Sequence, residues 1–404
     1  MQPQRIHLID GMRGLSLFGI LLANLLIFQY GIYGKDSISI PSLSSVDTGT
    51  YQFLKIFIES SFMPIFTFLF GYSMIKMAEG IERNGAKVKR HLVRRFILLA
   101  AIGLLHSSFL WEGDILFLYG MMGFFLLLFL NRKKKTLLIW GIILFVLSSA
   151  LTYGQLEEPI EDLERMATYI TNTNDVYANG TYTEIMTHRI NEDPLNISGL
   201  EVAFMLLFAP LALAPLFLFG MYAARANHFS NPTSERNRYK IGMAILLPLG
   251  LLLKSVGTLA AENDWTYVFL SIGGPLLALG YISAFAYAYT RFSKFIMMNA
   301  FENVGKLSLT NYLLQTVICT SIFYGYGLGQ FGKLGVLNSI VIGLVIFSVQ
   351  CVLSHWYLKH FRRGPLEFIL RMWTNFSWSG RVKVKNKQSS YPPVDNQQPG
   401  FTGQ

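Results

Sequence analysis

The chain has 404 residues, of which 52% are hydrophobic and only 14% are charged, and its net charge is +10. Ordinary soluble domains carry about 25% charged residues, so this composition argues against a secreted or disordered protein. A nucleic-acid-binding module gathers its positive charge on one soluble face, whereas the charges here lie in short clusters between long apolar runs. The two cysteines, Cys319 and Cys351, both lie within such runs, so neither a disulfide framework nor a zinc site is predicted.

Ten apolar runs are long enough to cross a membrane. A helix needs about 20 mostly apolar residues to cross a hydrocarbon core of about 30 Å, and lipid requires every backbone group to be hydrogen-bonded within the protein. We therefore predict an all-α, polytopic membrane helical bundle. The predicted spans are about 14–34, 53–75, 93–110, 115–131, 136–153, 200–224, 241–259, 267–290, 307–326 and 337–358.

The charges separate cleanly between the two sides of this ten-span arrangement. With the N-terminus inside, 28 of the 34 basic residues but only seven of the 24 acidic residues fall on the inner side. Because cytoplasmic segments are enriched in Lys and Arg, both termini are predicted to be cytoplasmic in a multi-pass protein of the cell membrane.

The spans divide the chain into four regions. Residues 1–153 and 200–379 each hold five spans, and residues 380–404 are basic and then rich in Ser, Pro, Gln and Gly, which is typical of a disordered tail. The acidic outer segment 154–199 has two interpretations, a lid or binding loop and a solvated connector.

The residues after the last span predict an amphipathic helix over about 365–375. Gly364 and Pro365 end the span, and Pro is favoured at the first position of a helix. Glu367 and Arg371 lie four residues apart on a polar side opposite an apolar one. We expect this helix to lie on the inner membrane surface without crossing it.

An ionisable group within a span is a candidate functional residue because it is costly in lipid. His106 lies late in the third span, and Glu112 and Asp114 follow in a tight turn. A neutral imidazole near two carboxylates is suited to act as a general base. The alternative is structural: His106 bonds a neighbouring helix, Asp114 caps the next helix and Glu112 is solvated.

Other polar residues lie at the start of the first span or within spans. Asp10 and Arg13 share one face of a helix, where they could hold a phosphate or carboxylate or serve as an interfacial cap and anchor. Lys254 is expected to extend outward toward the acidic end of its span. Three further polar residues are expected to face other helices, namely Asn24, Asn311 and Gln315.

Three groups of short motifs in this chain point to a known family. They are Asp10-Gly-Met-Arg-Gly14 leading to Asn24, Arg94-Arg95 leading to His106 and Gly113-Asp-Ile-Leu116, and Leu309 to Gln315 with Phe323-Tyr-Gly325 and Gly364-Pro-Leu-Glu367. On these motifs the chain resembles the YeiB-like bacterial membrane proteins over essentially its whole length. That family's C-terminal half is a domain of unknown function, so the resemblance implies architecture more than activity.

The Asp-x-x-Arg-Gly opening is more distantly similar to the transmembrane acyltransferases, including the polytopic O-acyltransferases and the heparan glucosaminide acetyltransferase group. Those enzymes take an acyl group from cytoplasmic acyl-CoA and pass it to an acceptor, often across the membrane. The resemblance implies a ten-helix core with a central channel for the acyl donor. The first span departs from the O-acyltransferase pattern because it has no His, so another base, His106, would be needed.

The leading hypothesis is therefore a membrane acyltransferase with acyl-CoA as donor substrate and no metal. Arg13, Arg94 and Arg95 would attract the CoA phosphates, with Asp10 holding Arg13. His106, supported by Asp114 or Glu112, would deprotonate an envelope or small-molecule acceptor. The alternatives are a small-solute transporter or permease and a non-catalytic membrane component. The lipid bilayer is the expected partner, and no nucleic-acid partner is expected.

Overall fold

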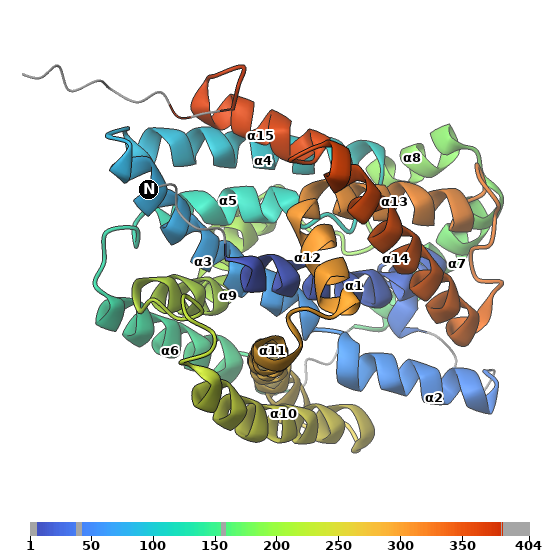
Figure 1. Cartoon of the computed structure of the whole chain (residues 1–404). Helices are drawn as coiled ribbons and strands as arrows, with labels where there is room; N and C mark the ends of the chain where they lie inside the picture. The colour runs from blue at the N-terminus through green and yellow to red at the C-terminus, as the bar shows by residue number, and fades with distance from the viewer. Residues whose placement is uncertain (1–5, 38–42, 155–158, 381, 383–404) are drawn as a thin grey trace, which may run out of the picture.

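The computed structural model describes residues 6–37, 43–154, 159–380 and 382. This part of the chain consists of helices joined by turns and contains no strand, which confirms the predicted all-α class (Figure 1). Apart from residues 380 and 382, the predicted tail 380–404 lies outside the described residues.

The helices follow one another with short connections. The first half comprises α1 (His7–Tyr30), the 3₁₀ turn η1 (Gly34–Asp36), α2 (Ser45–Phe53), the π-helix η3 (Leu54–Ile58), α3 (Phe62–Arg83), α4 (Val88–Phe109), α5 (Leu116–Leu126) and α6 (Lys134–Ala150). The rest comprises α7 (Ile160–Asn179), α8 (Tyr182–Asn191), α9 (Gly199–Arg225), α10 (Arg236–Leu259), α11 (Thr266–Phe292), α12 (Ile296–Lys306), α13 (Ser308–Phe323), α14 (Gly335–His360) and α15 (Pro365–Asn375).

Seven helical stretches among the described residues are long and apolar enough to cross a membrane: α1, the stretch from α2 to α3, α4, α9, α10, α11 and α14. All seven coincide with predicted spans. The other three predicted spans contain α5, α6 and α13, which have 11, 17 and 16 residues. A helix of that length rises at most about 26 Å. The structure therefore has the helices of a membrane protein, and the count of ten crossings stays a prediction.

Helix α1 lies at the centre of the bundle. It contacts α3, α11, α12, α13 and α14, and most of its apolar surface is buried in the protein. A helix that is apolar on every side is typical of such an enclosed position. Because α1 is enclosed, Asp10 and Arg13 in its first two turns lie between other helices.

The short helix α12 was not predicted and packs closely against the start of α1 (Figure 1). A Cβ on Gly305 would lie 1.8 Å from the Asp10 carbonyl oxygen, so only Gly permits this approach. The buried Glu302 of α12 accepts hydrogen bonds from Tyr289 and His7. The sequence pattern placed these residues in an inner connection, because 11 residues are too few to register as a span.

The predicted span 53–75 is not one continuous helix. It is broken between η3 and α3, where Ser60 has a φ of +56°. Lys254 of α10 is fully buried there and donates to the Glu59 carbonyl and, at 3.4 Å, to the Ser61 hydroxyl. The expectation that Lys254 extends outward was wrong, because carbonyl groups freed at a helix end need donors.

The acidic segment 154–199 contains two helices, α7 and α8, that pack onto the bundle, and its residues 155–158 lie outside the described part. Tyr177 is fully buried, and its carbonyl accepts the Gly325 N–H at 2.7 Å. The Tyr182 hydroxyl donates to the Phe109 carbonyl at 2.7 Å. These contacts favour a docked hairpin over a solvated connector.

Helix α15 has the predicted bounds and packs against α4 and α13. The Trp373 indole N–H donates to the Arg94 carbonyl at 2.8 Å, while Phe368 and Ile369 on the other side are exposed. The helix is too short to cross a bilayer. Its exposed apolar side agrees with a surface position.

Candidate functional site

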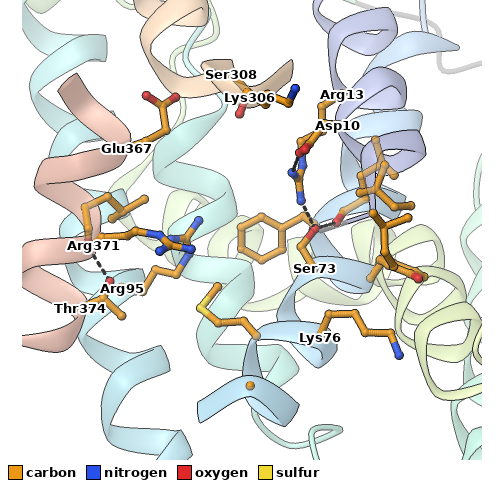
Figure 2. Close-up of a pocket in the computed structure, with 18 of the residues that line it drawn as sticks. Asp10, Arg13, Ser73, Lys76, Arg95, Lys306, Ser308, Glu367, Arg371 and Thr374 are labelled. Carbon is orange, nitrogen blue, oxygen red and sulfur yellow. Dashed lines mark hydrogen bonds and ion pairs between the residues drawn. The ribbon is translucent and has the colours of Figure 1, made fainter. Parts of the chain in front are cut away.

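A large open cavity lies at the end of the bundle where α1 begins and α14 ends, here called the basic end. Its volume is 1540 Å³, and α1, α3, α4, α12, α13 and α15 contribute to its walls. Figure 2 shows Arg13, Ser73 and Lys76 on one side and Arg95, Glu367 and Arg371 on the other. Phe66, Phe70 and Leu309 add apolar surface.

Basic side chains outnumber acidic ones around this cavity. The three carboxylates are Asp10, Glu79 and Glu367. The eight cationic residues are Arg13, Lys76, Arg83, Arg95, Lys306, Arg362, Arg363 and Arg371. Clustered positive charge in a concave, partly apolar space favours an anionic ligand.

The expected pair of Asp10 and Arg13 is present and faces the cavity. Asp10 is only 2% exposed, and its carboxylate accepts a hydrogen bond from the Arg13 guanidinium at 2.8 Å. A second guanidinium nitrogen donates to the Ser73 hydroxyl of α3 at 2.5 Å (Figure 2). An acidic residue in the first turn is also favoured by the helix dipole. Arg13 is therefore held in a defined orientation at the cavity wall.

Arg94 and Arg95 have separate positions, although both were expected to bind the ligand. Arg95 lines the cavity and makes no hydrogen bond or ion pair with any of the described residues. Arg94 does not line it, and its guanidinium lies 4.0 Å from the centroid of the Phe376 ring. Neighbouring residues on a helix point about 100° apart, so only one of the two can face the cavity.

Glu367 connects α15 to the start of α13. Its carboxylate accepts the N–H groups of Leu309 at 2.7 Å and Thr310 at 3.1 Å, and the Thr310 hydroxyl at 2.7 Å. It thus satisfies donors that a helix N-terminus leaves free. Arg371, one turn further along α15, also lines the cavity.

A second polar centre is buried between α4, the start of α5 and α13. The ring of His106 bonds the Asp114 carboxylate at 2.8 Å through Nδ1 and the Thr316 hydroxyl at 3.0 Å through Nε2. Asp114 also accepts the Phe117 N–H at 2.7 Å, so it caps α5 as well. The side chains of His106 and Asp114 are each 1% exposed. The predicted contact with Asp114 is present, and His106 is not among the residues that line the large cavity.

Glu112 contacts the hairpin at the opposite end and has no bond to His106. It accepts a hydrogen bond from the Tyr177 hydroxyl at 3.1 Å and lies 3.5 Å from the Arg189 guanidinium. The turn at Gly113 directs Glu112 and Asp114 to different neighbours. The structure therefore shows no contact through which Glu112 could support His106.

The polar residues of α13 join it to α14. Asn311 donates to the Ser354 hydroxyl at 3.1 Å, and Gln315 donates to the Gln350 side chain at 2.9 Å. Both residues are buried, as expected for helix-to-helix contacts. Asn24 is half-buried in α1 and does not line the large cavity.

Several residues of both centres were not singled out from the sequence. In the sequence, the cavity residues Lys76, Lys306, Arg362 and Arg363 belong only to the excess of basic residues predicted for the inner side, and that excess is the available signal. Thr316 carried no signal, because a Thr in an apolar helix is unremarkable until its neighbour is known.

Comparison with known proteins gives the family. A model described as a protein of unknown function, DUF418, matches residues 223–377. The uncharacterised protein YxaH of Bacillus subtilis strain 168 is 32% identical over 392 residues, which cover 94% of this chain and 96% of the relative. The uncharacterised protein YeiB of Escherichia coli K12 is 27% identical over 394 residues, which cover 91% and 95%. The chain belongs to the YeiB-like DUF418 family.

The DUF418 match and the two polar centres overlap only in part. The matched region includes most of the C-terminal half, with Lys306, Thr316, Glu367 and Arg371. Asp10, Arg13, Arg95, His106 and Asp114 all precede it. Both centres of this DUF418 protein are therefore built from residues inside and outside the matched region.

Proposed function

We propose that the protein is a membrane acyltransferase that takes acyl-CoA into the basic cavity and passes the acyl group to an envelope or small-molecule acceptor. The cavity carries this proposal, because it combines 1540 Å³ of open space with eight cationic side chains. CoA bears several phosphate groups, and Arg forms strong charge-assisted hydrogen bonds with phosphate. The apolar wall suits the neutral remainder of the molecule.

The proposal includes an orientation in the cell membrane. The basic end faces the cytoplasm, where acyl-CoA is found, and the chain crosses ten times with both termini inside. In this arrangement 28 of the basic residues fall on the inner side and 17 of the acidic residues fall on the outer side, which supports the orientation. The short helices α5, α6 and α13 then cross together with their flanking residues.

His106 is the base in this proposal. Eleven residues along α4 separate it from Arg95, which corresponds to about 16 Å. To reach His106, the acyl-bearing end of CoA would therefore have to pass from the cavity between α4 and α13. Asp114 holds the Nδ1 side of the ring, which leaves Nε2 to accept a proton.

Ligand binding tests the cavity directly. Calorimetry on the purified protein should detect CoA, and Arg95→Gln should weaken binding by about 10- to 100-fold, the effect of losing one bond to a charged group. Arg94→Gln is the matched control and should bind as the wild type does. No CoA binding by the wild type, or equal loss in both variants, would contradict the proposal.

Acyl transfer tests the chemistry. Labelled acetyl-CoA, purified protein and an envelope extract should yield a labelled product. His106→Gln should still bind CoA but transfer about 10²- to 10⁴-fold more slowly, as expected for loss of a general base. Flux of an anionic solute into proteoliposomes without an acyl donor would instead identify a transporter.

A further inference from the structure

The buried polar centre contains a carboxylate, an imidazole and a hydroxyl in one hydrogen-bonded series. The geometry points to Thr316 as a nucleophile: we propose that its hydroxyl carries the acyl group as an ester between donor and acceptor. This inference rests on the proposed acyl transfer and deepens it, because it adds a covalent intermediate and a residue that holds it.

The direction of the hydrogen bonds supports this role. Asp114 accepts the Phe117 N–H and is therefore held as an acceptor facing Nδ1 of His106. Nδ1 then carries the proton, and the lone pair of Nε2 accepts the Thr316 O–H at 3.0 Å. A base bonded to a hydroxyl and oriented by a third group is the arrangement that activates Ser and Thr nucleophiles on unrelated folds.

Neighbouring contacts hold the three groups in place. A Cβ on Gly103 would lie 2.0 Å from the Phe117 nitrogen and 2.7 Å from the Asp114 carboxylate, so Gly allows α4 and α5 to meet here. The bond from Gln315 to Gln350 fixes the rotation of α13, which carries Thr316. Preorganised groups of this kind are what covalent catalysis requires.

A donor for the developing oxyanion lies beside His106. The Trp111 side chain is fully buried, and its indole N–H has no hydrogen-bond partner among the described residues. Its ring lies edge-on to the His106 ring, with centroids 6.5 Å apart. A buried donor without an acceptor is unusual. The carbonyl oxygen of a bound acyl group would supply that acceptor and be stabilised as it gains charge.

The reaction balances in two steps. In the first, the Thr316 oxygen attacks the thioester carbonyl while Nε2 of His106 takes the hydroxyl proton. The carbon–sulfur bond breaks, and the CoA thiolate receives that proton. In the second, His106 takes a proton from the acceptor hydroxyl or amine, which attacks the ester. The bond from the acyl carbon to Thr316 breaks, and the Thr316 oxygen regains the proton.

Trapping the intermediate is the decisive experiment. Purified full-length protein is incubated with acetyl-CoA without acceptor, and its mass is measured intact and by peptide. The expected result is one acetyl group on Thr316, released by hydroxylamine. Thr316→Cys keeps a nucleophile and should form the adduct as a thioester. Thr316→Val should form none and lose transfer by at least about 10²-fold.

Two controls separate chemistry from folding. Thr320→Val alters another buried Thr one turn along α13 and should leave acetylation and transfer unchanged. Thr316→Ser keeps the hydroxyl and should retain transfer even if Thr316→Val proves unstable. Full transfer by Thr316→Val, or transfer with no adduct in either the wild type or Thr316→Cys, would overturn the intermediate and leave the acyltransferase standing. Failure of the wild type to bind CoA would overturn both.

Discussion

Arg13 and Arg95 line the same cavity but differ in the partners that their guanidinium groups bond. Asp10 and Ser73 bond the Arg13 guanidinium, which fixes its orientation and offsets part of its charge. Arg95 has no bonded partner among the described residues. A half-buried cation that no carboxylate pairs within hydrogen-bonding distance gains most from an anionic ligand. Arg95 is for this reason the more informative position to mutate.

Gly305 determines how closely α12 approaches α1. We expect Gly305→Ala to destabilise the protein by about 1–3 kcal/mol, because its Cβ would overlap the Asp10 carbonyl and displace α12. The measurement is the thermal unfolding midpoint of the purified protein in detergent. CoA binding should weaken as well, since the same displacement moves Arg13 relative to α12.

Gly49 provides the matched control. It lies in α2, and no atom lies within 4 Å of the position its Cβ would take. Gly49→Ala should therefore be neutral or stabilise by up to about 1 kcal/mol, through helix propensity. Equal midpoints for Gly305→Ala and the wild type would show that α12 adjusts freely.

At the scale of elements, the α7–α8 hairpin is held by an aromatic and histidine cluster. His188 of α8 is 9% exposed, bonds the Thr173 hydroxyl at 2.8 Å and stacks on Tyr169. Burial lowers the pKa of His188 below 6.5, against the opposing effect of Glu192 and Glu112. The closed hairpin therefore favours the neutral form of the His188 imidazole.

We predict that acid loosens this hairpin. The closed state binds the His188 proton less tightly than the open state, so its stability is complete above pH 6.5 and decreases as the pH falls through the lowered pKa. Amide exchange, corrected for its intrinsic pH dependence, should show less protection of residues 160–191 at about pH 5 than at about pH 7.5. His188→Gln should remove the difference, and greater protection in acid would contradict the prediction.

Helix α15 acts as a wall of the cavity as well as a surface helix. Glu367 bonds α13 and Trp373 bonds the α4 backbone, so α15 connects two helices distant in the chain. Arg371 faces the cavity from this wall. Its exposed Phe368 and Ile369 suit insertion at the boundary between lipid headgroups and acyl chains.

On the scale of the whole molecule, the two polar centres are arranged along the bundle. The basic cavity opens at one end, and the His106 centre is buried toward the end that carries α7 and α8. A donor entering from one side and an acceptor approaching from the other would meet at the buried centre. This arrangement makes the orientation in the membrane a central prediction.

Accessibility labelling of intact cells tests that orientation. A cysteine at the exposed Asn179 should react with a membrane-impermeant reagent, because the positive-inside pattern places α7 outside. A cysteine at the exposed Lys133, between α5 and α6, should react only after lysis. The reverse pattern would overturn the proposed topology, and labelling of both sites in intact cells would refute the ten-crossing arrangement.

Features that depend on neighbours along the chain could be read from the sequence. Apolar runs predicted the long helices, spacing of three residues predicted the Asp10–Arg13 pair, and Gly364 with Pro365 predicted the start of α15. These follow from local hydrogen bonding and helical periodicity. The break at Ser60 and the short helix α12 could not be predicted from the sequence, because each is stabilised by a partner far along the chain.

What the sequence by itself determined is the helical class, the clustering of charge between apolar runs and the candidate residues Arg13, Arg95, His106 and Asp114. Only the tertiary structure decided which of them lie together. It separated Arg94 from Arg95, gave Glu112 to the hairpin and brought Thr316 to His106 across 210 residues. The physical reason is that contacts between helices depend on their rotation and depth, which close packing at residues such as Gly103 and Gly305 sets and which no local pattern contains.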